Sequence, residues 1–132
     1  MKKHGAYHLK ITVANGKVSK RFYDELFHEL KWRTVYEDDD AAGYSDGSFT
    51  LWVVPLEKGR ALKHNPKAAG YHHFSVRVPN KSDVDRIYKW CNMNKVKVTD
   101  PPRAYPEYNK GYYAVFFLDP DGLKLEITYL EG

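Results

Sequence analysis

The stretch His8-Leu9-Lys10-Ile11-Thr12-Val13 returns later in the chain as His73-Phe74-Ser75-Val76-Arg77-Val78. Both copies begin with a histidine and then alternate between apolar and polar residues. Alternation with a period of two predicts a β-strand that buries one face and leaves the other open. The repetition indicates that one structural unit occurs twice in this chain.

The residues that follow each strand repeat in the same order. An amphipathic stretch comes first, and Ser19 or Ser82 is its expected N-cap. A short strand follows at residues 32–37 and again at 95–99. Each half then ends in a hairpin, with Asp46-Gly47 before residues 49–54 and Asp121-Gly122 before residues 123–130. The apolar faces of the two expected helices are formed by Phe22, Leu26, Phe27 and Leu30, and by Val84, Ile87, Tyr88 and Cys91.

These patterns predict an α+β fold in which two βαβββ modules, about residues 7–55 and 72–130, form a cupped open barrel. A linker at 56–71 contains Gly59, Pro66 and Gly70, and we interpret residues 1–132 as a single domain. A sheet that is covered by one helix has a second face, which must pack on another sheet or line a cavity. The concave face would therefore be shared by corresponding strands of the two modules.

The composition excludes several classes of protein. The chain has 132 residues, of which 42% are hydrophobic and 29% charged, as in an ordinary globular domain. Its single cysteine, Cys91, excludes an internal disulfide and a cysteine-rich zinc module. The net charge of +4 is dispersed, so we expect no nucleic-acid partner. Apolar runs are too short for a membrane helix, and a soluble cytoplasmic protein is expected.

Strand parity predicts a metal site on the open face. Leu9 and its alternate neighbours should face a helix, which leaves His8 on the other side, and the same reasoning applies to His73 and Glu126. Two imidazoles and one carboxylate are suitable ligands for Zn, Mn, Ni or Fe(II). His72 has the opposite parity and is expected near the linker. The alternative is that the strand histidines are ordinary core or surface residues.

The chain resembles the vicinal oxygen chelate superfamily, which contains glyoxalase I, fosfomycin-inactivating thiol transferases, extradiol dioxygenases and bleomycin-sequestering proteins. The resemblance is carried by the two histidine-led strands and above all by residues 116–127, with Asp119-Pro120-Asp121-Gly122 followed by Glu126. Residues 105–113 also resemble a poorly characterised bacterial branch of that superfamily. The resemblance implies paired modules, a divalent metal at His8, His73 and Glu126, a catalytic role for Glu126, and a homodimer.

Two departures from the family pattern narrow the expected chemistry. Glyoxalase I supplies a fourth ligand from the first module, where alignment of the Asp-Gly turns places Leu51. Fosfomycin enzymes carry a tyrosine where this chain has Phe116. Compact extradiol dioxygenases remain an alternative, although the sequence does not identify the extra proton-transfer histidine that they usually need. Three ligands with open positions suit a substrate that chelates the metal through vicinal oxygens.

We expect the substrate to be a small molecule, anionic or aromatic. Lys10 and Arg77 share the open face and are candidate anion partners, unless their side chains extend into solvent. A further set of candidate substrate-binding residues is apolar or aromatic, unless it simply fills the core: Phe49, Leu51, Val53, Ala114, Phe116, and Tyr105 and Tyr108 from a proline-rich loop at 101–111. The chain would be an isomerase, lyase, transferase or ring-cleaving enzyme. The alternatives are a sequestering protein of the bleomycin-resistance type, and a regulatory domain with a filled cup and no ion.

Overall fold

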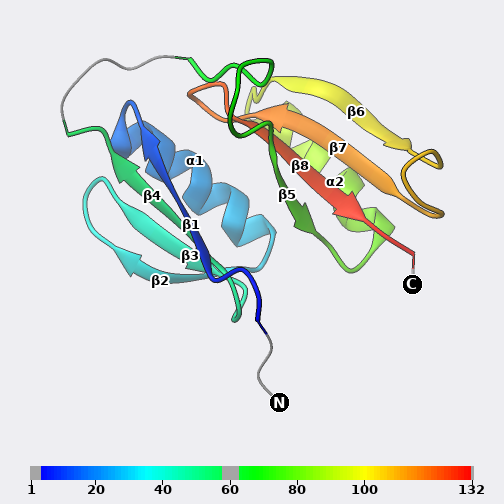
Figure 1. Cartoon of the computed structure of the whole chain (residues 1–132), viewed down its shortest axis with the longest axis horizontal. Coiled ribbons are helices and arrows are strands. Elements are labelled where there is room, and N and C mark those ends of the chain that lie inside the picture. Colours follow the sequence, from blue (N-terminus) through cyan, green and yellow to red (C-terminus); the bar gives the residue numbers. More distant parts are fainter. Residues whose placement is uncertain (1–3, 58–62, 132) are drawn as a thin grey trace. The chain divides into compact units, whose positions relative to one another are not determined.

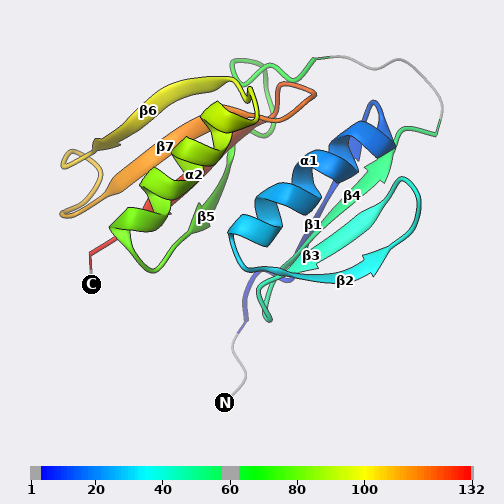
Figure 2. The same cartoon turned by 180° about the vertical axis from the view of Figure 1, so that it is seen from behind.

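The computed structural model describes residues 4–57 and 63–131 and divides the chain into two compact units, Met1–Leu62 and Lys63–Gly132. Each unit has the order β-α-β-β-β, so the predicted α+β fold with two βαβββ modules is confirmed. In each unit a single helix covers one face of a four-stranded sheet (Figures 1 and 2). None of the described helices is long and apolar enough to cross a membrane.

The first unit contains five elements in chain order. They are β1 (His8–Val13), α1 (Gly16–Glu29), β2 (Arg33–Glu37), β3 (Ala42–Ser45) and β4 (Thr50–Pro55). The strand order in the sheet is β1-β4-β3-β2, in which β1 and β4 are parallel and the other pairs antiparallel. The helix buries Tyr23, Leu26 and Phe27, which are spaced to lie on one face.

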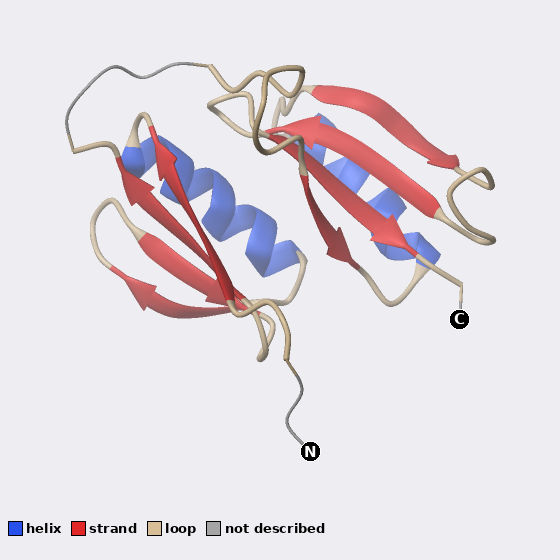
Figure 3. Ribbon diagram, in the orientation of Figure 1, coloured by secondary structure: helices blue, strands red, loops and turns tan. Residues whose placement is uncertain are grey.

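The second unit repeats this arrangement with different lengths (Figure 3). Its elements are β5 (Phe74–Arg77), α2 (Lys81–Met93), β6 (Val98–Ala104), β7 (Tyr113–Leu118) and β8 (Lys124–Tyr129). The strand order is β5-β8-β7-β6, again with a parallel first pair. Val84, Ile87 and Cys91 on α2 are buried, together with Leu125 and Ile127 on the facing side of β8. Burial raises the pKa of the Cys91 thiol to about 12.

Both helices begin earlier than the sequence patterns suggested. Asn15 caps α1, where its side-chain oxygen accepts a hydrogen bond from the Val18 backbone N–H at 3.2 Å. Asn80 is the N-cap of α2, and its backbone N–H donates to the Asp83 carboxylate at 3.1 Å. Asparagine is as good an N-cap as serine. Ser19, the expected first cap, is instead buried inside α1.

β6 also differs from expectation. It was predicted as a short strand at 95–99 followed by a loop, but it extends through Pro101 and Pro102 to Ala104. Proline is tolerated here because β6 is an edge strand with two interruptions in its pairing with β7. The consequence is that Arg103 belongs to a strand and lies opposite Ala114.

Candidate functional site

A cavity of about 350 Å³ lies on the second unit. It is lined by His72, His73, Asp100, Arg103, Tyr105, Tyr108, Tyr112, Phe116, Lys124 and Glu126. The list includes two of the three predicted metal ligands and three of the predicted substrate-binding residues. All ten residues come from β6, β7 and β8 or from segments next to these strands and β5.

The strand register explains why these side chains meet. Glu126 on β8 lies opposite Ser75 on β5 and opposite Phe116 on β7, so the three positions form one row across the sheet. Leu125 and Ile127 alternate with Glu126 and are buried on the α2 side. Because side chains alternate across a strand, Glu126 points away from the helix. His73 immediately precedes β5 and reaches the same carboxylate.

Glu126 is the buried centre of the cavity. It is only 3% exposed, and its Oε1 lies 3.1 Å from His73 Nε2. Its second oxygen, Oε2, accepts a short hydrogen bond from the Tyr112 hydroxyl. Burial and this hydrogen bond raise the pKa of Tyr112 to about 12. The phenol is therefore protonated at neutral pH and is able to donate to the carboxylate.

His72 also belongs to the cavity, which corrects its expected place beside the linker. Its Nδ1 lies 2.7 Å from Nδ1 of His73. Parity does not determine where the His72 side chain points, because β5 begins only at Phe74 and alternation has not started at His72. One chain of contacts therefore runs from His72 through His73 to Glu126 and Tyr112.

Aromatic rings form one wall of the cavity. The Tyr105 and Tyr108 rings are stacked with centroids 5.1 Å apart, and Phe116 meets both Tyr105 and His73 edge-on. Tyr105 is 4% exposed, whereas Tyr108 is 63% exposed at the surface. The guanidinium of Arg103 lies 3.7 Å from the centroid of the Tyr105 ring. The wall offers flat apolar surfaces to an aromatic or apolar group.

Two cations stand beside this wall, and each has an acidic partner. Lys124 Nζ lies 4.8 Å from the Phe116 ring centroid and 3.6 Å from the Asp100 carboxylate. Arg103 lies 3.6 Å from the Glu107 carboxylate. Arg103 and Glu107 are exposed and Asp100 is half-exposed, so solvent and salt screen both ion pairs in part. Both cations are therefore able to exchange their partners for an anionic ligand.

Three other predicted site residues lie elsewhere. His8 and Lys10 are exposed on the open face of β1, because Leu9, Ile11 and Val13 take the face toward α1. Lys10 lines a separate open hollow of about 530 Å³ on the first unit, with Thr12, Asp38 and Glu57 among its neighbours. Arg77 is exposed at the end of β5 opposite Thr128, outside the cavity around Glu126.

The structure corrects the position of the apolar residues of β4. Leu51, expected on the open face, lies opposite Leu9 and Tyr44, and Tyr44 packs on Phe27 of α1. Leu51 and Val53 are therefore part of the core, 1% and 0% exposed. Phe49, expected on the same open face, packs instead against Trp32, which in turn contacts Phe27.

The faces of β4 were assigned wrongly because the turns before β4 and β8 differ in length. In the first unit the backbone N–H of Asp46 donates to the carbonyl of Phe49 across the turn. In the second unit the N–H of Asp119 donates to the carbonyl of Leu123, so the second turn is one residue longer. Aligning the two Asp-Gly pairs therefore shifts β4 by one residue and exchanges its faces.

Trp52 is the true counterpart of Glu126. It lies opposite Lys10, as Glu126 lies opposite Ser75. Its indole lies across Gly43 of the neighbouring strand, where an added Cβ would come within 2.6 Å of the ring. Tryptophan, like leucine, cannot coordinate a metal, so the position equivalent to Glu126 offers no fourth ligand in the first unit.

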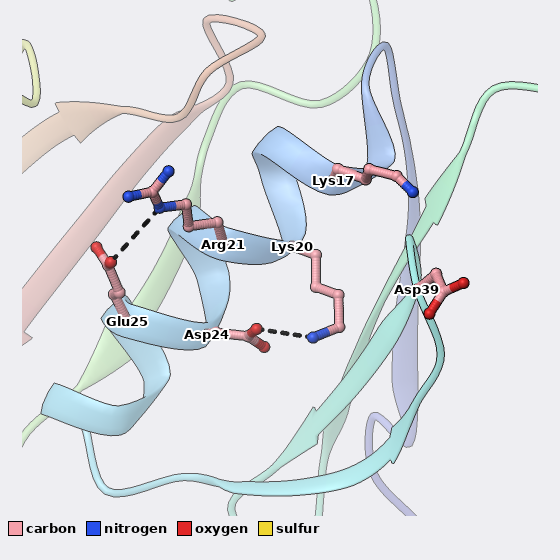
Figure 4. A pocket seen from close by; sticks show the side chains of 6 residues that line it. All are labelled: Lys17, Lys20, Arg21, Asp24, Glu25 and Asp39. Carbon is pink, nitrogen blue, oxygen red and sulfur yellow. Dashed lines mark hydrogen bonds and ion pairs between the residues drawn. The ribbon is translucent and has the colours of Figure 1, made fainter.

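A further hollow lies along α1, and the positive and negative charges that line it balance one another (Figure 4). Three cations and three anions line it, namely Lys17, Lys20, Arg21, Asp24, Glu25 and Asp39. Lys20 Nζ is paired with Asp24 at 2.8 Å and with Glu37 at 3.1 Å, and Arg21 is near Glu25 at 4.0 Å. The hollow lacks the excess of one charge that would attract an ion.

The spacing of His73 and Glu126 fits a divalent metal. Bonds of about 2.1 Å that meet at 90–109° place two ligand atoms about 3.0–3.4 Å apart. The measured Nε2 to Oε1 distance is 3.1 Å. Among residues 4–57 and 63–131 no three His, Cys, Asp or Glu side chains gather as a complete ion site. The second unit thus brings two of the three predicted ligands, His73 and Glu126, next to each other.

Besides His72, which was expected elsewhere, and Lys124, which has the parity of Glu126, three residues of the cavity were not predicted. Tyr112 precedes Ala114 and Phe116 with the same parity, so extending that alternation by one step would have found it. Asp100 and Arg103 gave no such signal, because β6 changes its pairing with β7 between these residues. Irregular pairing removes the period of two on which face assignment depends.

Comparisons with known proteins identify relatives over nearly the whole chain. The family model described as Glyoxalase/Bleomycin resistance protein/Dioxygenase superfamily matches residues 5–127. The uncharacterized protein YqjT of Bacillus subtilis is 23% identical over 92% of this chain and 96% of its own length. The metallothiol transferase FosB of Staphylococcus epidermidis is 22% identical over 91% of this chain and 78% of its own. The crystal structure of a putative glyoxalase from Bacillus halodurans has a TM-score of 0.81 and 22% identity, with 95% of both chains covered.

Proposed function

This chain belongs to the glyoxalase/bleomycin resistance protein/dioxygenase superfamily, and on that premise we propose that it is a metal-dependent enzyme acting on a small molecule. The substrate would be held through two neighbouring oxygen atoms, and the reaction would be an isomerase, lyase, transferase or ring-cleavage step. A cytoplasmic homodimer stays a prediction, and sedimentation of the purified protein measures its assembly.

The observation that carries the proposal is the pair formed by His73 and Glu126. A buried carboxylate with an imidazole nitrogen 3.1 Å away has the spacing of two ligands of one divalent ion. His8 is proposed as the third ligand because it has the same place in β1 that His73 has before β5. FosB, a metallothiol transferase by name, supports a metal in a distant relative.

When bound, a divalent ion would act as a Lewis acid toward the substrate oxygens. The chain's own residues have separate tasks. Tyr112 holds the second oxygen of Glu126 and so fixes the orientation of that carboxylate. The rings of Tyr105 and Phe116 would pack against an apolar or aromatic part of the substrate. Lys124 and Arg103 would attract an anionic group, since both lie at the same wall.

Metal analysis of protein purified without a histidine tag tests the proposal. We expect one divalent ion per chain after exposure to Mn, Fe(II), Ni or Zn, and loss of that ion in His8→Ala and Glu126→Gln. His28→Ala is the matched control, because His28 is an exposed histidine at the end of α1. Wild-type protein that takes up none of these ions would refute the enzyme proposal.

A second function, sequestration without turnover, is favoured by one specific feature of the cavity. His73, Tyr112 and Glu126 satisfy one another by hydrogen bonds in the absence of an ion, beside the stacked pair Tyr105 and Tyr108. Such a cavity is able to bind an aromatic compound directly. Binding of aromatic carboxylates that is unchanged by EDTA would support sequestration, whereas binding that requires the ion would support the enzyme.

A further inference from the structure

His72 stands next to a proposed metal ligand without being part of the ligand set. Its Nδ1 and that of His73 are 2.7 Å apart, and the two rings meet at 75°. A contact this short between two ring nitrogens is a hydrogen bond, in which one nitrogen carries the proton and the other accepts it. The direction of this bond follows from what His73 does at its other nitrogen.

Without an ion, Glu126 sets the direction. An ionised carboxylate only accepts hydrogen bonds, so His73 Nε2, at 3.1 Å, must carry a proton and donate. When the His73 ring is neutral, its single N–H is the one on Nε2, and its Nδ1 is bare. The proton between the two rings therefore belongs to His72, whose Nδ1–H donates to His73.

With an ion, the same bond must reverse. Ligation through Nε2 requires that nitrogen to be bare, so the proton of the His73 ring has to be on Nδ1, where it needs an acceptor. Nδ1 of His72 is already at the right distance. The Nε2 proton of His73 passes to solvent, the shared proton moves to His73 Nδ1, and His72 takes one proton from solvent on Nε2. The number of protons bound to the pair is unchanged.

We infer that His72 is the positioning residue of His73 in the ion-bound protein, where Nδ1 of His72 accepts the proton on Nδ1 of His73 and so holds the ring with Nε2 bare. The inference rests on the proposed metal site, which it deepens. A protein partner behind a ligating histidine is worth about 10–100-fold in metal affinity. Because His72 is exposed, water replaces part of its contribution, and we expect the lower end of this range, about tenfold.

Zinc titration of the full chain tests the inference with two variants at this position. His72→Phe keeps a ring of similar size but removes the nitrogen, and should weaken Zn²⁺ binding about tenfold. His72→Asn places an amide oxygen near the position of Nδ1 and should bind within about threefold of wild type. His28→Phe is the control and should leave the affinity unchanged. Far-UV circular dichroism checks that each variant is folded.

Nitrogen NMR of the histidine rings gives a second readout that needs no catalytic activity. In metal-free protein His72 should carry its proton on Nδ1 and His73 on Nε2, and Zn²⁺ should reverse both. The inference is overturned if His72 is still protonated on Nδ1 when Zn²⁺ is bound, or if His72→Phe binds Zn²⁺ as well as wild type. It is also overturned if His72→Asn loses binding as completely as His73→Ala, since His72 would then be a ligand. Failure of wild-type protein to bind any ion would instead refute the proposed function itself.

Discussion

The hydrogen bond from Tyr112 to Glu126 allows a quantitative test of the cavity. Tyr112→Phe removes one hydroxyl group and leaves Oε2 of a carboxylate that is 3% exposed without that donor. Hydrogen bonds to charged groups contribute about 1.5–3 kcal/mol. Water from the open cavity is able to replace part of this bond, so we expect the free energy of unfolding to fall by about 2 kcal/mol.

Urea unfolding of metal-free protein measures this loss, and amide exchange in β7 and β8 reports the second unit separately. Tyr108→Phe is the control, because that ring is 63% exposed, and its effect should stay within about 0.5 kcal/mol. A double-mutant cycle with Glu126→Gln should give a coupling energy of about 1 kcal/mol. Additive effects, or a Tyr112→Phe protein as stable as wild type, would refute the assigned bond.

Three further predictions concern the fold. Leu51→Ala should lower the free energy of unfolding, measured in urea, by about 3 kcal/mol, since Leu51 is 1% exposed. Lys10→Ala, at an exposed position, should change it by less than about 0.5 kcal/mol. Equal effects would contradict the assignment of the two faces. Asn15→Ala should cost about 1 kcal/mol in the same assay by removing the cap of α1, and no loss would refute that cap. Because burial raises the pKa of Cys91 to about 12, its thiol is protonated at pH 8, and a thiol reagent should label it only in denaturant.

Much of the fold was predictable because the sequence repeats a simple pattern. Alternation in β1 and β8 assigns Leu9 and Leu125 to the helix side, and the structure has Leu125 buried and Leu9 half-buried between the exposed His8 and Lys10. The pairing of His73 with Glu126 followed from the same parity, because both lie in or next to regular strands with a fixed register. Local periodicity is sufficient where strands are regular.

The remaining features depend on geometry that a period does not encode. A one-residue difference between two turns exchanged the faces of β4, so Trp52 was overlooked in favour of Leu51. Interrupted pairing hid Arg103 in an edge strand that contains two prolines. His72 lies before the first residue of β5, where alternation has not yet begun.

The contact between Gly43 and Trp52 makes substitutions at these two positions depend on each other. Because the indole occupies the volume where any Cβ at position 43 would stand, even alanine there must lift the ring from the strand. The reverse also follows, since a larger residue at 43 becomes acceptable only when 52 becomes small. A library built to reshape this surface should therefore randomise the two codons jointly, because single-site scans would reject combinations that are compatible as a pair.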